Sequence, residues 1–190
     1  MDAPSRRSLL AGAATGLATL AGCLQTDDGS LGGDERPTGS GGQAGSAATE
    51  SPSGPEPREL ESVDAPGSPG GAVAVRTPRE VALLDFFATW CAPCKPQMSR
   101  LVAVREAHPD LHVVSITPET DRAAIASFWR EYDGAWPVAI DPELRVTDSF
   151  DVNRIPTLLV LAPDGNLVWR HTGLAEAAAI RSAVDEARRE

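Results

Sequence analysis

Residues 81–94 read VALLDFFATWCAPC, an apolar run that ends in two cysteines three positions apart. The first seven residues are almost continuously apolar, which is typical of a strand buried on both faces. Met98, Leu101 and Val102 then follow at helical spacing, so a helix is expected to begin at the cysteine pair. Unpaired N–H groups and the positive end of the helix dipole favour a thiolate there. Two such thiols can close and reopen a disulfide by exchange, so the segment predicts a redox site.

A structural zinc site or an inert buried pair is the alternative interpretation of Cys91 and Cys94. Zinc usually needs two further Cys or His ligands with their own short spacing. The chain has one other cysteine, Cys23, and the histidines at positions 108, 112 and 171 form no such cluster. We therefore expect a redox pair, with no metal ion and no cofactor.

Residues 1–22 have the form of an export signal. The sequence SRRSLL at residues 5–10 resembles the twin-arginine motif, and the apolar, small-residue run after it is short for a membrane span. The run ends in LAGC at residues 20–23, which resembles the lipobox of prokaryotic lipoproteins. This resemblance implies a lipid on Cys23 and a position at the extracytoplasmic face of the cell membrane. A mitochondrial transit peptide or a plain secretory signal is the alternative, and neither explains Cys23.

Residues 23–70 are rich in Gly, Ser, Pro and acidic residues. They hold too few apolar side chains to form a core, so we expect a disordered tether. Residues 24–70 carry nine Asp or Glu against two Arg, a net charge of −7, which argues against a nucleic-acid partner. The whole chain has one lysine, Lys95, against sixteen arginines. This composition resembles proteins of halophilic archaea, and a GC-rich genome is the alternative explanation.

Residues 71–190 are expected to form one domain. The predicted strands span residues 72–75, 81–87, 111–117, 136–140, 157–162 and 167–171. Four helices are predicted. The first runs from the cysteine pair to about Ala107, the second from Pro118 to Gly134, the third around residues 143–150, and the last begins at Gly173. The last of these is expected to bury Leu174, Ala177, Ile180, Val184 and Ala187. This order of elements predicts an α/β sandwich with a mixed central sheet.

From Val81 onward the chain resembles thioredoxin-fold proteins, and in particular the extracytoplasmic TlpA/ResA-type thiol–disulfide oxidoreductases. The shared features are LDFFATWCAPCK at residues 84–95, IDP at residues 140–142, RIPT at residues 154–157 and DG at residues 164–165. About forty residues separate Thr117 from Thr157, more than a minimal thioredoxin has there. The resemblance implies a three-layer thioredoxin-like sandwich with a TlpA-type insertion of one helix and one strand.

The resemblance also implies roles for the residues of the site. Cys91 is expected to be the exposed, readily ionised attacking thiol, and Cys94 the buried thiol that resolves the mixed disulfide. The expected contacts with a substrate are Trp90, Pro93, Ile155 and Pro156. A cis peptide bond before Pro156 leaves the backbone of the preceding residue open to an extended substrate. Core packing of Trp90 and a trans Pro156 at the start of a strand are the alternatives.

Asp85 is the charged residue inside the predicted strand at residues 81–87. Burial disfavours the charged form of a carboxylate, so we expect a raised pKa and proton exchange with Cys94 during resolution. The position matches the buried aspartate of thioredoxin, whereas many TlpA-type proteins carry Asn there and use a Glu elsewhere. A solvated strand end is the alternative interpretation.

The resemblance implies an anchored enzyme that exchanges disulfides with exported proteins that carry Cys pairs, apocytochrome c among them. It is expected to work as a reductant supplied by an upstream dithiol donor, although the sequence does not set the reduction potential or the direction. A non-enzymatic metal- or solute-binding lipoprotein on the same fold is the alternative, but copper carriers of this fold resemble CxxxC. A peroxiredoxin places a lone attacking cysteine after a threonine, and this sequence lacks that arrangement.

Overall fold

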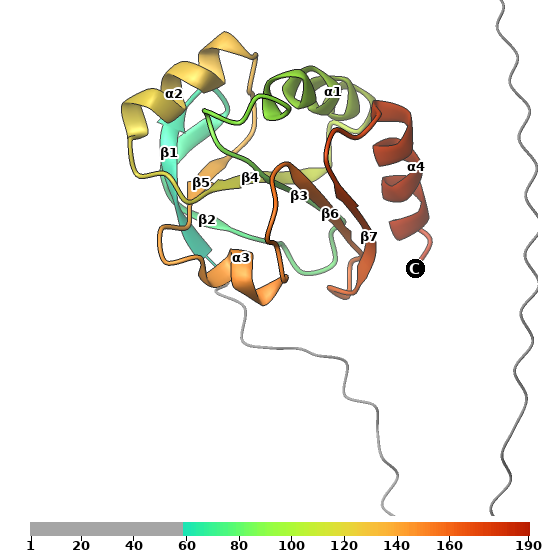
Figure 1. Cartoon of the computed structure of the whole chain (residues 1–190). Helices are drawn as coiled ribbons and strands as arrows, with labels where there is room; N and C mark the ends of the chain where they lie inside the picture. The colour runs from blue at the N-terminus through green and yellow to red at the C-terminus, as the bar shows by residue number, and fades with distance from the viewer. Residues whose placement is uncertain (1–58) are drawn as a thin grey trace, which may run out of the picture. The chain divides into compact units, whose positions relative to one another are not determined.

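The computed structural model describes residues 59–190, so the predictions for residues 1–58, Cys23 included, lie outside the described part of the chain. Its strands are β1 (Glu59–Ala65), β2 (Ser68–Ala74), β3 (Ala82–Phe86), β4 (His112–Thr117), β5 (Val138–Ile140), β6 (Thr157–Leu161) and β7 (Leu167–Thr172). Its helices are α1 (Cys94–Ala107), α2 (Arg122–Glu131), α3 (Arg145–Ser149) and α4 (Ala177–Ala187). From residue 81 onward these elements follow the predicted order (Figure 1).

The strands form one mixed sheet in the order β2-β1-β5-β4-β3-β6-β7. β3, β4 and β5 are parallel neighbours, because α1 and α2 each return the chain across the sheet between two of these strands. β6 pairs antiparallel with both β3 and β7, and β6 and β7 are joined by the turn at residues 163–166. The predicted mixed sheet is confirmed.

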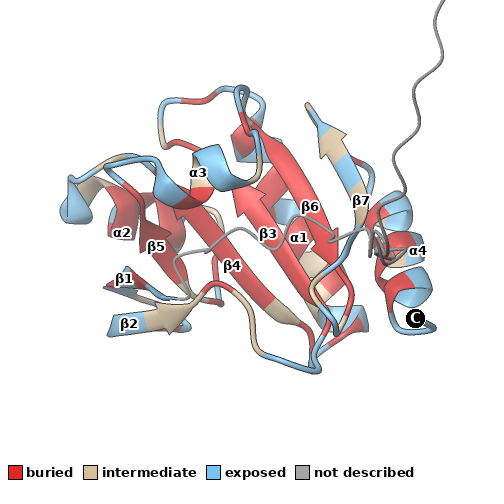
Figure 2. Cartoon of the chain, turned by 90° about the horizontal axis from the view of Figure 1, so that it is seen from below, coloured by how far each residue is buried: buried red, intermediate tan, exposed pale blue. Residues whose placement is uncertain are grey.

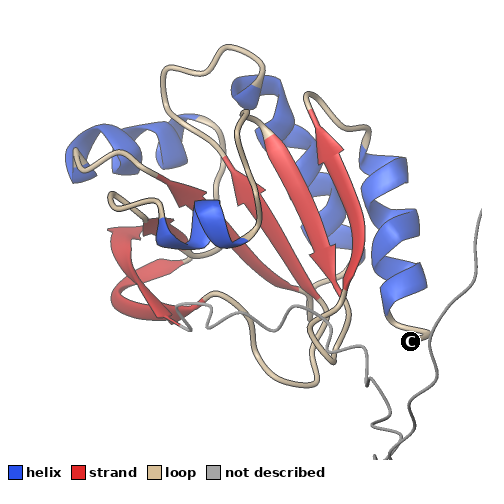
Figure 3. Cartoon of the chain, turned by 60° about the horizontal axis from the view of Figure 1, so that its bottom comes forward, coloured by secondary structure: helices blue, strands red, loops and turns tan. Residues whose placement is uncertain are grey.

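Helices cover both faces of this sheet (Figure 3). One hydrophobic cluster holds buried residues of α1, α2 and α4, and a second cluster on the opposite face holds Val146 of α3. The three-layer sandwich is thereby confirmed. α2 and β5 lie between β4 and β6 in the chain and supply the extra helix and strand expected of a TlpA-type insertion.

β3 lies inside the sheet, and all five of its residues are buried (Figure 2). Side chains alternate between the two faces along a strand. Leu83 and Phe87 belong to the cluster under α1, whereas residues 84 and 86 belong to the cluster on the other face. Asp85 therefore lies on the same face as the cluster that contains both cysteines.

The prediction of a tether through residue 70, with a domain that starts at residue 71, is wrong for residues 59–70. These residues form β1 and the start of β2, and β1 pairs antiparallel with β5. Leu60 and Val63 are buried, so this segment contributes to the core. Gly67 turns between the strands with a φ of +70°, where a Cβ would lie 2.2 Å from the Ala135 carbonyl carbon. Pairing with β5, nearly eighty residues further along the chain, orders the segment despite its Gly and Pro content.

Two helices begin later than predicted. α2 starts at Arg122 rather than Pro118, because Asp121 Oδ1 accepts a hydrogen bond from the Ala124 N–H (3.0 Å) and caps the helix. α4 starts at Ala177, so Leu174 precedes the helix and is exposed, which contradicts its predicted burial. Of the remaining predicted positions on this helix, Ala177 is partly buried, and the buried ones are Ile180, Val184 and Ala187.

Candidate active site

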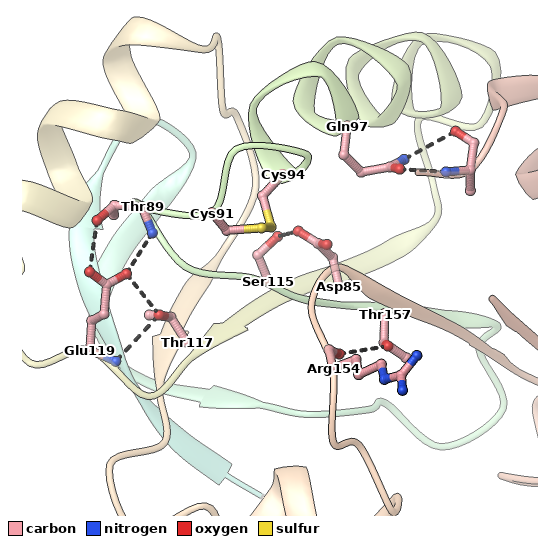
Figure 4. Close-up of a disulfide and its surroundings, with 11 residues drawn as sticks. Asp85, Thr89, Cys91, Cys94, Gln97, Ser115, Thr117, Glu119, Arg154 and Thr157 are labelled. Atoms are coloured by element: carbon pink, nitrogen blue, oxygen red, sulfur yellow. Dashed lines mark hydrogen bonds between the residues drawn. A yellow bond between two sulfur atoms is a disulfide. The ribbon is translucent and has the colours of Figure 1, made fainter. Parts of the chain in front are cut away.

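Cys91 and Cys94 form a disulfide at the junction between β3 and α1 (Figure 4). The S–S distance is 2.01 Å and the two Cα atoms lie 5.3 Å apart. The Cys91 N–H donates to the Ala88 carbonyl and the Cys94 N–H donates to the Cys91 carbonyl, both at 3.1 Å. Pro93 occupies the N-cap position, and α1 begins at Cys94. The strand, the tight turn and the first helical residue thus hold the two sulfurs together.

The expected exposure of Cys91 is wrong for this disulfide-bonded structure. Cys91 is 4% exposed and Cys94 is 2% exposed, because both side chains pack into the hydrophobic cluster beneath α1. The residues around the sulfurs are the accessible ones: Pro93 is exposed, and Trp90 is 71% exposed. Core packing of Trp90 is therefore excluded, and its indole is available to a partner molecule.

Asp85 is buried on the sheet face under α1, and in Figure 4 it lies below the disulfide. Burial raises the pKa of Asp85 from its ordinary value of 3.8 to about 7, and a hydrogen bond from Ser115 opposes part of that rise. The expected burial and raised pKa are confirmed, and the solvated strand end is excluded. A carboxyl group with a pKa near neutrality can both accept and return a proton at physiological pH.

Ser115 and Trp136 belong to the same polar group as Asp85, and neither was predicted as a site residue from the sequence. Ser115 Oγ donates to Asp85 Oδ2 at 2.8 Å, and the Trp136 indole N–H donates to Ser115 Oγ at 2.9 Å. A signal existed for the first contact. Asp85 and Ser115 each fall on the fifth residue of the predicted strands at 81–87 and 111–117, and in-register parallel pairing places them side by side.

The peptide bond between Ile155 and Pro156 is cis, as the family resemblance implied. In the sheet register Thr157 pairs with Phe86, so Pro156 lies beside the end of β3, where the chain leaves for the cysteine turn. The Pro156 carbonyl accepts a hydrogen bond from the Gly173 N–H at 2.8 Å, and Thr157 Oγ1 donates to the Arg154 carbonyl at 2.8 Å. Ile155 is half-buried next to this fixed turn.

Glu119 holds the segment between β3 and the cysteine turn. Its two carboxylate oxygens accept hydrogen bonds from the Thr89 N–H (2.6 Å) and the Thr89 hydroxyl (2.7 Å), and the Thr117 hydroxyl adds a third (3.2 Å) (Figure 4). Thr89 and Glu119 follow the carboxyl ends of two neighbouring parallel strands. From the sequence, Glu119 lies within the helix predicted from Pro118, so this contact was not predicted.

Gln97 anchors the other side of α1. Its side chain is buried, and its amide oxygen accepts from the Ala175 N–H at 2.8 Å. The Arg100 guanidinium donates to the Ala175 carbonyl at 2.9 Å. These contacts fix the helix that carries Cys94 to the segment that leads into α4.

Between residues 59 and 190, no group of three or more His, Cys, Asp and Glu side chains is placed to hold a metal ion. Within the same range, none of the helices combines the length and the apolar character that a membrane crossing needs.

Comparison with known proteins identifies the family. The Redoxin family matches residues 53–186 of the chain. The thiol-disulfide oxidoreductase ResA of Bacillus subtilis is 30% identical over 93 residues, which cover 47% of this chain and 51% of ResA. A second ResA, from Bacillus cereus, is 26% identical over 92 residues. The chain thus spans about half the length of the curated relatives it matches.

Solved structures support the same fold. StoA from Bacillus subtilis aligns with a TM-score of 0.56 at 18% identity, over 66% of this chain and 93% of that chain. A secreted Mycobacterium tuberculosis disulfide oxidoreductase aligns with a TM-score of 0.59 at 19% identity, over 67% of this chain and 94% of that chain. At these identities the likeness is one of fold. The chain belongs to the Redoxin family, has a thioredoxin-like fold and is similar in sequence to ResA proteins.

Proposed function

We propose that this protein is a thiol–disulfide oxidoreductase that exchanges disulfides with cysteine pairs of other proteins. The observation that carries the proposal is the Cys91–Cys94 disulfide at the start of α1, on the same sheet face as the buried carboxyl of Asp85. Curated relatives that match about half of this chain are named thiol-disulfide oxidoreductases.

The reaction transfers two electrons. In the reducing direction, the Cys91 thiolate attacks one sulfur of a substrate disulfide, whose S–S bond breaks and releases a first substrate thiolate. Cys94 then gives its proton to the ionised Asp85 and attacks Cys91, which releases the second substrate thiolate with its bonding electron pair. The substrate gains two electrons, and its two thiolates take up two protons, one from Asp85 and one from solvent. The enzyme is left as the Cys91–Cys94 disulfide.

The accessible surface around the sulfurs supports contact with a protein substrate. Trp90 and Pro93 flank the disulfide and are exposed, and an exposed aromatic side chain can pack against an apolar segment of a partner. The turn at Ile155 and Pro156 lies beside the end of β3, where Ile155 is half-buried and Pro156 is buried, and we assign to it the backbone contact with the substrate. An extended substrate segment lies across both in the proposed complex.

A reducing role requires an upstream dithiol donor that returns the Cys91–Cys94 pair to thiols. The proposed substrates are exported proteins with cysteine pairs, with apocytochrome c as one example. The motif that ends at Cys23 supports a lipid anchor at the extracytoplasmic face of the membrane. Membrane fractionation tests the anchor: Cys23→Ala should move the protein from the membrane to the soluble fraction, and unchanged membrane association would contradict the proposal.

An insulin-reduction assay with dithiothreitol as the electron donor tests the catalytic proposal. The full chain carries Cys23→Ser, so that Cys91 and Cys94 are its remaining thiols. Cys91→Ser should abolish turnover, and Cys94→Ser should accumulate mixed disulfides that are visible on non-reducing gels. Trapping by Cys91→Ser instead of Cys94→Ser would reverse the assigned order of attack. Full turnover by both variants would refute the proposal.

A further inference from the structure

A chain of two hydrogen bonds reaches Asp85 through the interior. The Trp136 indole N–H donates to Ser115 Oγ at 2.9 Å, and Ser115 Oγ donates to Asp85 Oδ2 at 2.8 Å. All three side chains are buried, at 1%, 0% and 2% exposure. An indole nitrogen can donate but cannot accept. Ser115 Oγ must therefore accept from Trp136, and its single proton is directed to Asp85.

We propose that Ser115 and Trp136 are positioning residues for the exchange reaction, which keep Asp85 Oδ2 as a hydrogen-bond acceptor and leave Oδ1 to take and return the Cys94 proton. This inference rests on the proposed function, in which Asp85 is the proton acceptor. A proton on Oδ2 would oppose the Ser115 proton, whose direction is held because Trp136 donates to the same hydroxyl oxygen. A proton on Oδ1 leaves both hydrogen bonds intact.

The resolving step balances with this assignment. The Cys94 S–H bond breaks and its proton moves to Asp85 Oδ1. The Cys94 sulfur forms a bond to the Cys91 sulfur, and the bond between Cys91 and the substrate sulfur breaks, with its electron pair leaving on the substrate thiolate. Both interior hydrogen bonds persist throughout, so Asp85 changes charge without a rearrangement of Ser115 or Trp136.

The surroundings of Asp85 explain why the Ser115 hydroxyl affects the pKa of this carboxyl group. Burial raises the pKa of Asp85 to about 7 and the Ser115 hydrogen bond lowers it, with no charged side chain of residues 59–190 among the causes. In the sheet Asp85 pairs with Ser115 of β4 and Leu158 of β6, and the cluster on its face of the sheet contains Cys91 and Cys94. The nearby charged residues Lys95 on α1 and Arg154 before β6 are exposed to solvent.

Stopped-flow reaction of the reduced Cys23→Ser chain with dithiobis(nitrobenzoate) tests the proposal. Attack by Cys91 releases one thionitrobenzoate, and resolution by Cys94 releases the second. The resolution rate should rise with pH as Asp85 ionises, and Ser115→Ala should move the midpoint of this profile to higher pH. The rate below the midpoint then falls about tenfold for each pH unit of displacement. Trp136→Phe should move the midpoint in the same direction but by a smaller amount, because the indole N–H polarises the Ser115 hydroxyl to which it donates.

Ser68→Ala is the matched control. Ser68 is 1% exposed, and its hydroxyl donates to the Val63 carbonyl and accepts from the Val138 N–H. The variant therefore removes a buried serine hydroxyl that has two hydrogen bonds and none to Asp85. It should leave the midpoint unchanged. In an Asp85→Asn background, Ser115→Ala should no longer affect the profile. An unchanged midpoint in folded Ser115→Ala would overturn the inference.

An NMR titration of the Cys23→Ser chain supplies a second test, in which the signal is measured with the network intact. The Trp136 indole N–H signal, assigned by its loss in Trp136→Phe, should titrate with the same midpoint as the resolution rate and should stop titrating in Asp85→Asn. A signal that is insensitive to pH in the wild-type network would also overturn the inference. Release of a single thionitrobenzoate by the parent chain would instead refute the proposed function, so the two failures can be told apart.

Discussion

Two buried aspartates of this protein differ in how their carboxylates are bonded. Asp141 follows β5 and is fully buried, and its Oδ2 accepts three hydrogen bonds, from the Val146 N–H, the Thr147 N–H and the Thr147 hydroxyl. Asp85 in β3 is almost as deeply buried, but within the described residues the Ser115 hydroxyl is its one hydrogen-bond donor. Asp141 fastens the start of α3, whereas Asp85 lies under a disulfide.

Burial alone therefore does not mark a reactive carboxyl group. Three donors, two of them backbone N–H groups, occupy one oxygen of Asp141 and would lose their acceptor if that oxygen moved or were replaced. A single donor to Asp85 compensates little of the cost of burying a charge, so the pKa of Asp85 rises to about 7. The two aspartates thus differ in the number of fixed donors, three on Oδ2 of Asp141 and one on Asp85.

Asp85→Asn should give the largest effect. Between pH 3.8 and about 7 the unfolded carboxyl is ionised while the folded one keeps its proton, so stability falls as the pH rises and levels off above the folded pKa. Asn does not titrate. The difference in the free energy of unfolding, oxidised Asp85→Asn minus wild type, should therefore increase by about 4 kcal/mol from pH 4 to pH 8. Urea unfolding across pH measures this difference. Parallel stability curves for the two proteins would contradict the raised pKa of Asp85 and its contrast with Asp141.

Asp141→Ala should destabilise the protein by about 3 kcal/mol at pH 7, because it leaves two backbone N–H groups at the start of α3 without their acceptor. The pH profile of thiol–disulfide exchange should stay that of the wild type. Asp141→Asn, which keeps an acceptor oxygen, is the matched control and should lose less stability. A shifted exchange profile in folded Asp141→Ala would show that the two aspartates do not differ in function as argued.

Glu119→Gln extends the comparison to a half-buried carboxylate whose two oxygens both accept from Thr89. Gln can accept from the Thr89 N–H and donate to the Thr89 hydroxyl, so it loses the charge of the acceptor and not the contacts, and we expect a loss of about 1 kcal/mol in the free energy of unfolding. Cys91 lies two residues after Thr89, so the rate of the first thionitrobenzoate release should also fall. Unchanged stability and an unchanged first phase would show that the Thr89 contacts do not hold the cysteine turn.

Much of the site was predictable because its signals are local. The spacing of Cys91 and Cys94 at a strand–helix junction is encoded within a few residues, and the structure joins these two sulfurs. The burial of Asp85 could be inferred from its apolar neighbours on both sides. The burial of Cys91 and the exposure of Trp90 could not, because which side of the turn faces the core depends on how α1 packs on the sheet.

The start of the domain could not be predicted from local sequence either. Residues 59–70 have the composition of a linker, yet they form β1 and part of β2 because β5 offers an edge to pair with. Composition reports the average tendency of a segment. It does not report a partner strand that lies far away in the chain.

The order of elements from β3 onward, the redox pair and the buried carboxyl of Asp85 follow from the sequence alone, because hydrophobic period, turn residues and motif spacing act over short distances in the chain. Only the tertiary structure decided that Ser115 bonds to Asp85, that Trp136 bonds to Ser115 and that Glu119 holds Thr89. Asp85 and Ser115 are thirty residues apart, and the parallel register of β3 and β4 brings them together. A one-residue change of register would turn the Ser115 side chain to the other face of the sheet, away from Asp85. This contact therefore depends on the packing of the whole domain.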